Sequence, residues 1–204
     1  MRLIECEGAP RDLGFDQGRQ CRDALQAAFA RLARSTRAQL RLGGSRETRW
    51  LRREIRRFCP RQSELLEALA HAAGVPIAWL ASELVAGARA DCAASGPGPC
   101  AAARTRDGMG LLARTLPDCA ILRRSRPESG FRSLELTQPW RAEPLAGVNE
   151  AGLAVVWLGD VGRGAAPRRA PPAGLLAHDC LARFDGVEAA IEWLLVRPGA
   201  GASL

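Results

Sequence analysis

The chain has 204 residues, of which 47% are hydrophobic, so it can bury the core of one large domain or of two small ones. Its formal net charge is +7, and the sequence contains no lysine, so all 29 of these basic residues are arginines. A basic balance permits anionic partners such as acyl-CoA esters or nucleic acid, but it selects neither.

Several classes of protein are not expected from the composition. No run of about 18 apolar residues occurs, which argues against a membrane-spanning helix. The N-terminus carries Glu5 and Glu7 and has no apolar core of a secretory signal peptide. The seven cysteines form no CxxC pair and only two histidines are present, so we expect no metal, no cofactor and no disulfide framework. A cytoplasmic protein with reduced thiols is the default.

Helical periodicity dominates residues 1–99. After a short strand over 2–6, the predicted helices span residues 10–42, 46–58, 60–73 and 77–89. Gly14 and Gly18 fall inside the first of them, where a glycine costs about 1 kcal/mol relative to alanine. We therefore expect these glycines to allow another element to pack closely.

The pattern changes at a Gly/Pro-rich linker over 95–99. The predicted strands that follow span residues 100–105, 109–115, 131–137, 143–148 and 152–158. A loop rich in Gly, Pro and Arg and two helices, over 174–183 and 186–196, complete the chain. The expected fold class is α+β, with a helical region 1–99 and a strand-rich region 100–204.

Cys100 stands at the junction of these two regions. A thiol needs a base to form a thiolate, and no histidine is near Cys100 in the sequence. If the preceding peptide bond breaks, the new α-amino group of Cys100 can act as that base, with a pKa of about 7.7–8.0. The alternative interpretation is a buried strand cysteine, because cysteine is among the most buried residue types.

Two further residues are candidates for chemistry. Asn149 lies in a Gly-flanked turn, where its amide could stabilise an oxyanion, or where it could simply accept the backbone geometry of a hairpin. Arg114 ends a predicted hairpin strand, although it is one of many arginines. The arginine-rich segment 46–57 could bind phosphates, but its apolar face is typical of an amphipathic helix with a solvated basic side. Nucleic acid is therefore not the expected partner.

Several segments together carry a resemblance. Residues 7–18 form a Gly-x-Pro turn followed by a helix with two spaced glycines, and Cys100 and the Gly-Val-Asn-Glu-Ala-Gly-Leu segment 147–153 follow in order. Helical segments over 64–74, 82–89 and 187–190 lie between and after them. The chain resembles the acyl-CoA:6-aminopenicillanic acid acyltransferase family, the C45-type members of the N-terminal nucleophile (Ntn) hydrolases.

The resemblance implies a four-layer αββα domain that begins at Cys100 and is incomplete at its C-terminus. It implies self-cleavage before Cys100, whose sulfur then attacks an acyl carbon. Asn149 would stabilise the oxyanion, and Arg114 and Asp118 would order the site. The implied substrate is a small-molecule acyl amide or an acyl-CoA thioester, processed by hydrolysis or by acyl transfer.

The chain also departs from the family pattern. Pro99 and Ala101 flank the cysteine where the family has Gly and Thr, Thr115 replaces Asn, and Asp118 comes one position late. The family's later catalytic Asn and Arg have no counterpart. The alternative is therefore a catalytically impaired or truncated Ntn-like module, a non-catalytic subunit that pairs with a chain completing the domain.

Overall fold

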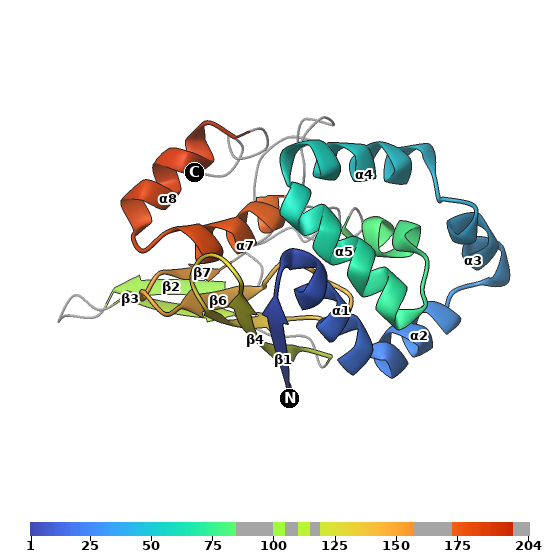
Figure 1. Cartoon of the computed structure of the whole chain (residues 1–204), viewed down its shortest axis with the longest axis horizontal. Coiled ribbons are helices and arrows are strands. Elements are labelled where there is room, and N and C mark those ends of the chain that lie inside the picture. Colours follow the sequence, from blue (N-terminus) through green and yellow to red (C-terminus); the bar gives the residue numbers. More distant parts are fainter. Residues whose placement is uncertain (85–99, 105–109, 115–118, 157–172, 198–204) are drawn as a thin grey trace.

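The computed structural model of the chain describes residues 1–84, 100–104, 110–114, 119–156 and 173–197 (Figure 1). The strands are β1 (Arg2–Gly8), β2 (Cys100–Arg104), β3 (Gly110–Arg114), β4 (Ile121–Pro127), β5 (Ser133–Thr137), β6 (Ala146–Asn149) and β7 (Ala154–Val156). The helices are α1 (Pro10–Gln20), α2 (Arg22–Ala30), α3 (Arg34–Arg41), α4 (Arg46–Phe58), α5 (Pro60–Ala73), α7 (Ala173–Arg183) and α8 (Val187–Leu195), and residues 77–84 are also helical. The predicted α+β class is confirmed.

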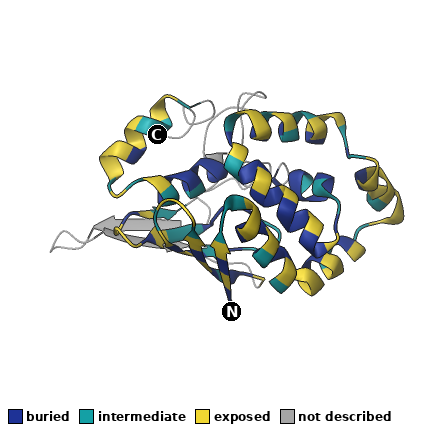
Figure 2. Ribbon diagram, viewed as in Figure 1, coloured by how far each residue is buried: buried dark blue, intermediate teal, exposed yellow. Residues whose placement is uncertain are grey.

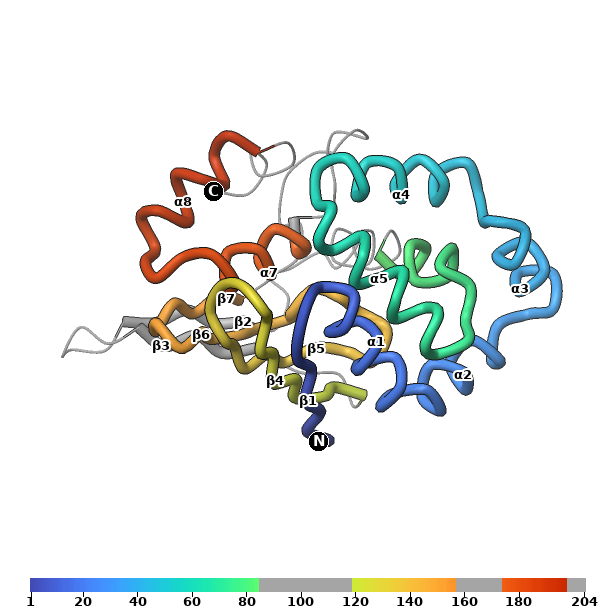
Figure 3. Tube along the Cα trace, viewed as in Figure 1, coloured from blue at the N-terminus to red at the C-terminus, as the bar shows by residue number. Residues whose placement is uncertain are grey.

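Two sheets occur in the described part of the chain. The larger one has the strand order β1-β4-β5-β6-β7, in which β1 runs parallel to β4 and the other pairs are antiparallel. The tube trace shows β1, at the start of the chain, beside β4 (Figure 3). Strands β2 and β3 form a separate antiparallel pair. The helical first region thus contributes a strand to the sheet of the second region.

The prediction of one continuous helix over 10–42 is wrong. The structure has three shorter helices there, separated at Cys21 and at residues 31–33. The backbone of Cys21 departs from helical geometry, with φ −105° and ψ 11°. Because both sides of the break keep apolar residues at helical spacing, periodicity alone does not reveal it. The predicted helices over 46–58 and 60–73 are confirmed.

Each predicted strand has a counterpart in the structure. Those over 100–105, 109–115, 131–137 and 143–148 are present with slightly different bounds, and the last is present as β7 within the described residues. Strand β4 was not predicted, because its sequence Ile-Leu-Arg-Arg-Ser-Arg-Pro contains three arginines. Its buried positions nevertheless alternate, and they include Arg123.

Helices α1 and α5 pack at very short range through the two predicted glycines. A Cβ atom on Gly14 would lie 2.1 Å from the carbonyl oxygen of Leu65, and one on Gly18 would lie 2.6 Å from that of Leu69. These distances are far below van der Waals contact, so only glycine fits at either position. The prediction that the glycines serve close packing is confirmed.

One continuous core joins the two regions of the chain. It includes Ile4 from β1, Leu69 from α5 and Leu175 from α7, all at most 1% exposed. Buried residues gather on α5, α7 and the sheet, whereas α3, α4 and α8 are largely exposed (Figure 2). The core therefore lies where the helices meet the sheet.

The two faces of the five-stranded sheet have an unusual chemistry. The face toward α1 and α7 is rich in buried polar residues, among them Arg123, Ser133 and Glu135. On the opposite face, Leu134 and Val148, which are directly paired between β5 and β6, form an apolar patch and are 40% and 42% exposed, whereas exposed charged residues of β1 and β4 continue the same face. The polar face is thus buried, and the apolar patch on the other face is only partly covered.

We predict that Gly14→Ala lowers the free energy of unfolding by about 3 kcal/mol, the upper part of the usual range for overpacking. The added methyl group would collide with the Leu65 carbonyl. Chemical denaturation measures the effect. Gly186→Ala is the matched control, since a Cβ there meets only a Glu188 carboxylate oxygen at 3.7 Å. Equal stability of the two variants would show that α1 and α5 do not pack this closely.

Candidate functional site

Cys100 and Arg114, two of the predicted site residues, are direct neighbours across a strand pair. β2 begins at Cys100, and the antiparallel register places Cys100 opposite Arg114. The Cα atoms of residues opposed in this way are about 4.5–5.5 Å apart. The third predicted residue of this region, Asp118, lies outside the described residues.

Asn149, the predicted oxyanion donor, is buried at the end of β6 and uses its whole amide in hydrogen bonds. Its Nδ2 donates to the carbonyl oxygens of Leu181 at 2.9 Å and Phe184 at 2.7 Å. Its Oδ1 accepts from the backbone N–H groups of Ala151 at 3.1 Å and Leu153 at 2.9 Å. An amide has two N–H donors, so both are occupied in this arrangement.

These bonds make Asn149 a clamp between the sheet and a helix end. The last carbonyl groups of a helix lack intrahelical donors and carry partial negative charge. Asn149 supplies donors to two carbonyl groups at the end of α7, and it also holds the β6–β7 turn. For Asn149 to stabilise an oxyanion, one of the bonds to α7 has to be exchanged for the substrate.

The most concentrated group of buried charges centres on Arg123. Its Nη2 donates to a carboxylate oxygen of Glu135 and, at 2.7 Å, to the carbonyl oxygen of Ala142. Its Nη1 donates to Oε1 of Gln17 on α1 at 2.6 Å. Arg123 and Glu135 are 1% and 0% exposed. The guanidinium therefore joins β4, β5, α1 and the segment after β5.

The ionisation of Glu135 depends on this arrangement. Burial by itself raises the pKa of the Glu135 carboxyl, but the Arg123 guanidinium and, to a smaller degree, His178 outweigh it. The hydroxyl of Ser133 also donates to Glu135, at 2.6 Å. The resulting pKa is about 2, so Glu135 is a carboxylate at neutral pH.

Two other ionisable groups border the Arg123 network. His178 Nε2 lies 3.8 Å from a Glu135 carboxylate oxygen, and burial lowers the pKa of this imidazole although Glu135 opposes the shift. Burial raises the pKa of Glu143, although Arg141, 3.1 Å away, opposes that shift. Within the described chain, His178 Nδ1 and Glu143 Oε2 are buried without a hydrogen-bond partner.

Sequence reasoning missed this network for a definable reason. Arg123 is one of three arginines in β4, and its neighbour Arg124 is exposed and pairs with Glu5 at 2.6 Å. Only the alternation of buried and exposed positions along β4 distinguishes the two arginines, and this strand was not predicted. The available signal was the period-two placement of Ile121, Arg123 and Ser125, together with a polar alternation in β5.

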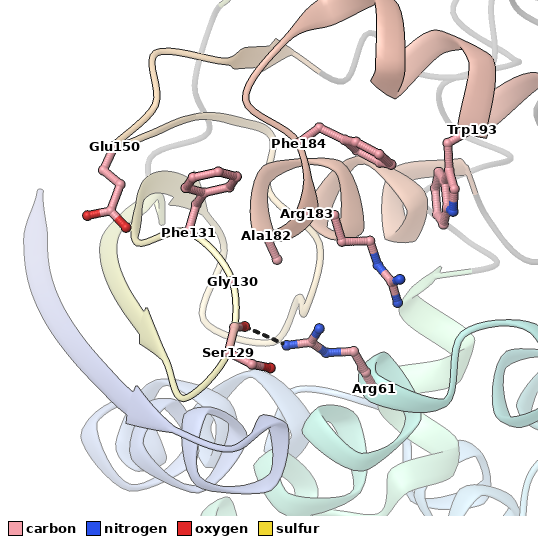
Figure 4. Close-up of a pocket in the computed structure, with 9 residues that line it drawn as sticks. All are labelled: Arg61, Ser129, Gly130, Phe131, Glu150, Ala182, Arg183, Phe184 and Trp193. Carbon is pink, nitrogen blue, oxygen red and sulfur yellow. Dashed lines mark hydrogen bonds between the residues drawn. The ribbon is translucent and has the colours of Figure 1, made fainter.

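A pocket of about 720 Å³ adjoins the Asn149 clamp (Figure 4). Its lining comes from the start of α5, the loop between β4 and β5, the β6–β7 turn, the end of α7, and α8: Arg61, Ser129, Gly130, Phe131, Glu150, Ala182, Arg183, Phe184 and Trp193. Two guanidinium groups and three aromatic rings thus surround one cavity. None of these residues was singled out from the sequence.

A smaller pocket of about 260 Å³ runs along α4. Four arginines of α4 line it together with apolar residues: Arg49, Arg52, Arg53 and Arg56. Arg56 pairs with Glu67 at 2.6 Å, where both side chains are well exposed. This surface agrees with the solvated basic side expected for the helix, and it adds no feature that selects nucleic acid.

The described cysteines fall into two groups. Cys6, Cys21, Cys59 and Cys180 are buried, and burial raises the pKa of each thiol, to about 12 for Cys6, Cys59 and Cys180. Cys119 is exposed. Thiols with such raised pKa values are poor nucleophiles at neutral pH. Among the described residues, no group of three potential metal ligands comes together.

No protein-family model matches the chain, and no curated protein matches it. In the described part of the chain, no helix is both long and apolar enough to cross a membrane.

Asn149→Asp tests the clamp. The aspartate keeps an acceptor for the turn, but it places a carboxylate oxygen against the Leu181 and Phe184 carbonyls. We predict a loss of about 3 kcal/mol in the free energy of unfolding, because buried acceptors would face each other without a donor. Gln138→Glu is the control, since the hydrogen bond that the Gln138 side-chain amide donates to Cys119 Sγ is solvent-exposed. A stable Asn149→Asp protein would instead indicate an amide free for chemistry.

Glu135→Gln tests the buried ion pair. We predict a loss of about 3–5 kcal/mol in the free energy of unfolding, because the variant leaves Arg123 buried without a counter-charge. Glu5→Gln removes an exposed pair with Arg124 and should cost less than about 1 kcal/mol. Denaturant titrations of both variants give the comparison. Similar losses of unfolding free energy in the two variants would show that the buried pair contributes no more to stability than the exposed one.

The same network predicts acid sensitivity. As the pH falls from about 4.5 to about 2, the unfolded chain protonates Glu135 before the folded protein does, so the free energy of unfolding decreases. Glu143 acts in the opposite direction, because its pKa is raised in the folded protein. Glu143→Gln should therefore lose stability more steeply on acidification than wild type. A shallower slope, measured by denaturation at a series of pH values, would refute this assignment.

Proposed function

We propose that the chain is a cysteine-dependent acyltransferase or amide hydrolase of the Ntn type, self-processed before Cys100. The observation that carries the proposal is the start of β2 at Cys100, with Arg114 opposite it in register. After cleavage, the first residue of a paired strand would hold its sulfur and its α-amino group together. Arg114 would bring a permanent positive charge to the neighbouring strand.

The sheet supports the four-layer αββα architecture that the proposal needs. In that architecture a sheet has helices on one face and a second sheet on the other. Here α1 and α7 lie on the buried polar face, and the apolar side chains of Leu134 and Val148 are partly exposed on the other. This apolar patch on β5 and β6 is suited to packing against another sheet, although the neighbouring Arg124 and Glu5 on the same face are charged.

The proposed chemistry has two stages. In processing, the Cys100 sulfur attacks the Pro99 carbonyl carbon, the bond to the Cys100 nitrogen breaks, and this nitrogen takes the thiol proton. Water then hydrolyses the thioester, which releases the Pro99 carboxylate with residues 1–99 and returns the free thiol beside the α-amino group of Cys100. In turnover, the sulfur attacks an acyl carbon while the α-amine takes its proton, the leaving group departs with that proton, and water or an amine accepts the acyl group.

Asn149 and Asp118 enter the proposal in supporting roles. Asn149 would donate to the oxyanion after exchanging one of its bonds to α7, and Asp118 would help Arg114 order the site. The proposed substrate is a small acyl amide or acyl-CoA thioester. The free thiols of the five described cysteines are compatible with the cytoplasmic location that we propose.

A non-catalytic pairing module is the second candidate. The full use of the Asn149 amide in structural bonds favours it, because an oxyanion donor should be free to meet its substrate. The partly exposed apolar face around Leu134 and Val148 also favours it, since a completing chain could cover that face. In this alternative Cys100 has no chemical role.

Self-processing is tested by the intact mass of the purified protein. We predict two fragments, residues 1–99 and 100–204, and a single uncut chain for Cys100→Ala. Cys119→Ala should still be cut, because it removes a different, exposed thiol and leaves Cys100 in place. Pro99→Gly should be cut faster, since proline restricts the backbone that the acyl shift distorts. If wild type and Pro99→Gly both stay whole, the pairing module is the better interpretation.

Reactivity of the thiol gives an independent measurement. In a Cys92→Ser/Cys119→Ser background, the thiols other than Cys100 are the four buried ones. Iodoacetamide at neutral pH should then label Cys100 faster than the others, by a factor that peptide mapping measures. Acyl amides and acyl-CoA thioesters should be turned over only by proteins that retain Cys100. Equal labelling of all thiols would contradict an activated nucleophile.

A further inference from the structure

We propose that the 720 Å³ pocket between the start of α5, the end of α7 and α8 binds a small carboxylate that carries an aromatic group. The proposal does not depend on Cys100 or on acyl transfer. It rests on the charge, the aromatic lining and the backbone bonds that hold the pocket in shape.

The positive charge of the pocket comes from two guanidinium groups on the same side of the cavity (Figure 4). Arg61 Nη2 donates to the carbonyl oxygen of Ser129 at 3.1 Å, and no carboxylate of the described residues lies within ion-pair distance of it. Arg183 Nε lies 3.6 Å from Asp179 Oδ1, which leaves its two Nη groups for other acceptors. Two arginines and one aspartate leave a net charge that matches a monoanion.

The one acid in the lining does not oppose an anion at this position. Glu150 lies across the pocket from the two guanidinium groups, beyond Phe131 (Figure 4). Its carboxylate is 4.0 Å from Nε of Arg132 and also accepts the Arg132 backbone N–H at 2.9 Å. The side of the pocket near Arg61 and Arg183 therefore keeps its positive character.

Aromatic rings form the rest of the lining. Phe184 and Trp193 pack with ring centroids 5.7 Å apart at an interplanar angle of 57°. Phe131 faces them from the loop before β5, and the small Ala182 lies between (Figure 4). Rings at these angles suit an aromatic group that packs face-to-edge. A ligand with one aromatic ring and one carboxylate matches both halves of the pocket.

The pocket is held by backbone bonds that also remove an unfavourable charge. Phe131 N–H donates to the Ala182 carbonyl at 2.9 Å, and a Cβ on Gly130 would lie 2.2 Å from that oxygen, so the loop is pressed against α7. Asn149 occupies the carbonyl groups of Leu181 and Phe184. The negative end of α7 is thus neutralised by donors, whereas Arg61 lies in the first turn of α5, at its positive end.

The size of the pocket is consistent with such a ligand. Binding sites for small molecules are usually clefts of about 300–1,000 Å³ with mostly apolar walls and a few polar groups that fix orientation. The volume of about 720 Å³ falls inside this range. Arginine suits the polar role because its planar guanidinium binds both oxygens of a carboxylate.

Titration calorimetry with 3-phenylpropanoate tests the proposal on the full chain. We expect a dissociation constant on the order of 1 mM for a ligand this small. Arg61→Gln should weaken binding at least about tenfold, as expected for loss of a charge-assisted hydrogen bond. Arg49→Gln is the matched control, because Arg49 is also a helix arginine that donates to a single backbone carbonyl, that of Gly44 at 3.0 Å. The control should bind like wild type.

The chemistry of the ligand is tested with two analogues. Uncharged 3-phenylpropan-1-ol and the aliphatic carboxylate butanoate should each bind at least about tenfold more weakly than 3-phenylpropanoate. Ala182→Leu should block the cavity, and thermal unfolding shows whether that variant and Arg61→Gln are folded. Cys100→Ala should bind normally, which separates this site from the acyl chemistry.

Three outcomes would overturn the proposal. The first is the absence of binding to wild type at about ten times the expected dissociation constant. The second is equal weakening by Arg61→Gln and Arg49→Gln, which would indicate a general effect of net charge. The third is undiminished binding by a folded Ala182→Leu protein, which would place the ligand elsewhere.

Discussion

The buried guanidinium of Arg123 is the constraint on which the arrangement of the sheet and its covering helix depends. An isolated ion in the interior costs several kcal/mol, and arginine cannot escape the cost by losing its proton. It donates hydrogen bonds to Glu135 on β5, to Gln17 on α1 and to the carbonyl of Ala142. Glu135 and Ala142 follow Arg123 by 12 and 19 residues, but Gln17 lies 106 residues before it, so all these bonds form only when α1 is docked on the β4–β5 pair.

Two further buried amides, those of Gln17 and Asn149, also join separate segments through hydrogen bonds. Gln17 also donates to the carbonyl groups of Pro139 at 3.0 Å and Arg141 at 2.9 Å, and so fixes the segment that follows β5. Asn149 then fixes the end of α7 against β6. Polar side chains therefore fix the positions of the elements on this face. Apolar residues such as Leu69 and Leu175 contribute the buried hydrophobic surface of the core.

The sequence was sufficient for most elements but not for the polar interior. Helices α4 and α5 and the hairpin strands follow from local periodicity and turn residues, which are short-range properties. Strand β4 does not, because nothing local distinguishes the buried Arg123 from the exposed Arg124. The role of Asn149 is likewise invisible in its Gly-flanked turn, since the carbonyl groups that it binds lie more than thirty residues later.

Some residues of the candidate site could be predicted from local sequence, and others could not. Cys100 and Arg114 were identified as single residues, and their register follows from an ordinary hairpin. The pocket lined by Arg61, Phe131 and Trp193 requires tertiary contacts among five segments of the chain, so no spacing in the sequence reveals it.

Asn149 links the two parts of the site, because its bonds to Phe184 and Leu181 shape one wall of that pocket. Releasing the amide to serve an oxyanion would therefore loosen the wall. The proposed use of Asn149 in acyl chemistry would thus disturb the pocket beside α7, whereas ligand binding in that pocket requires no such release of the amide.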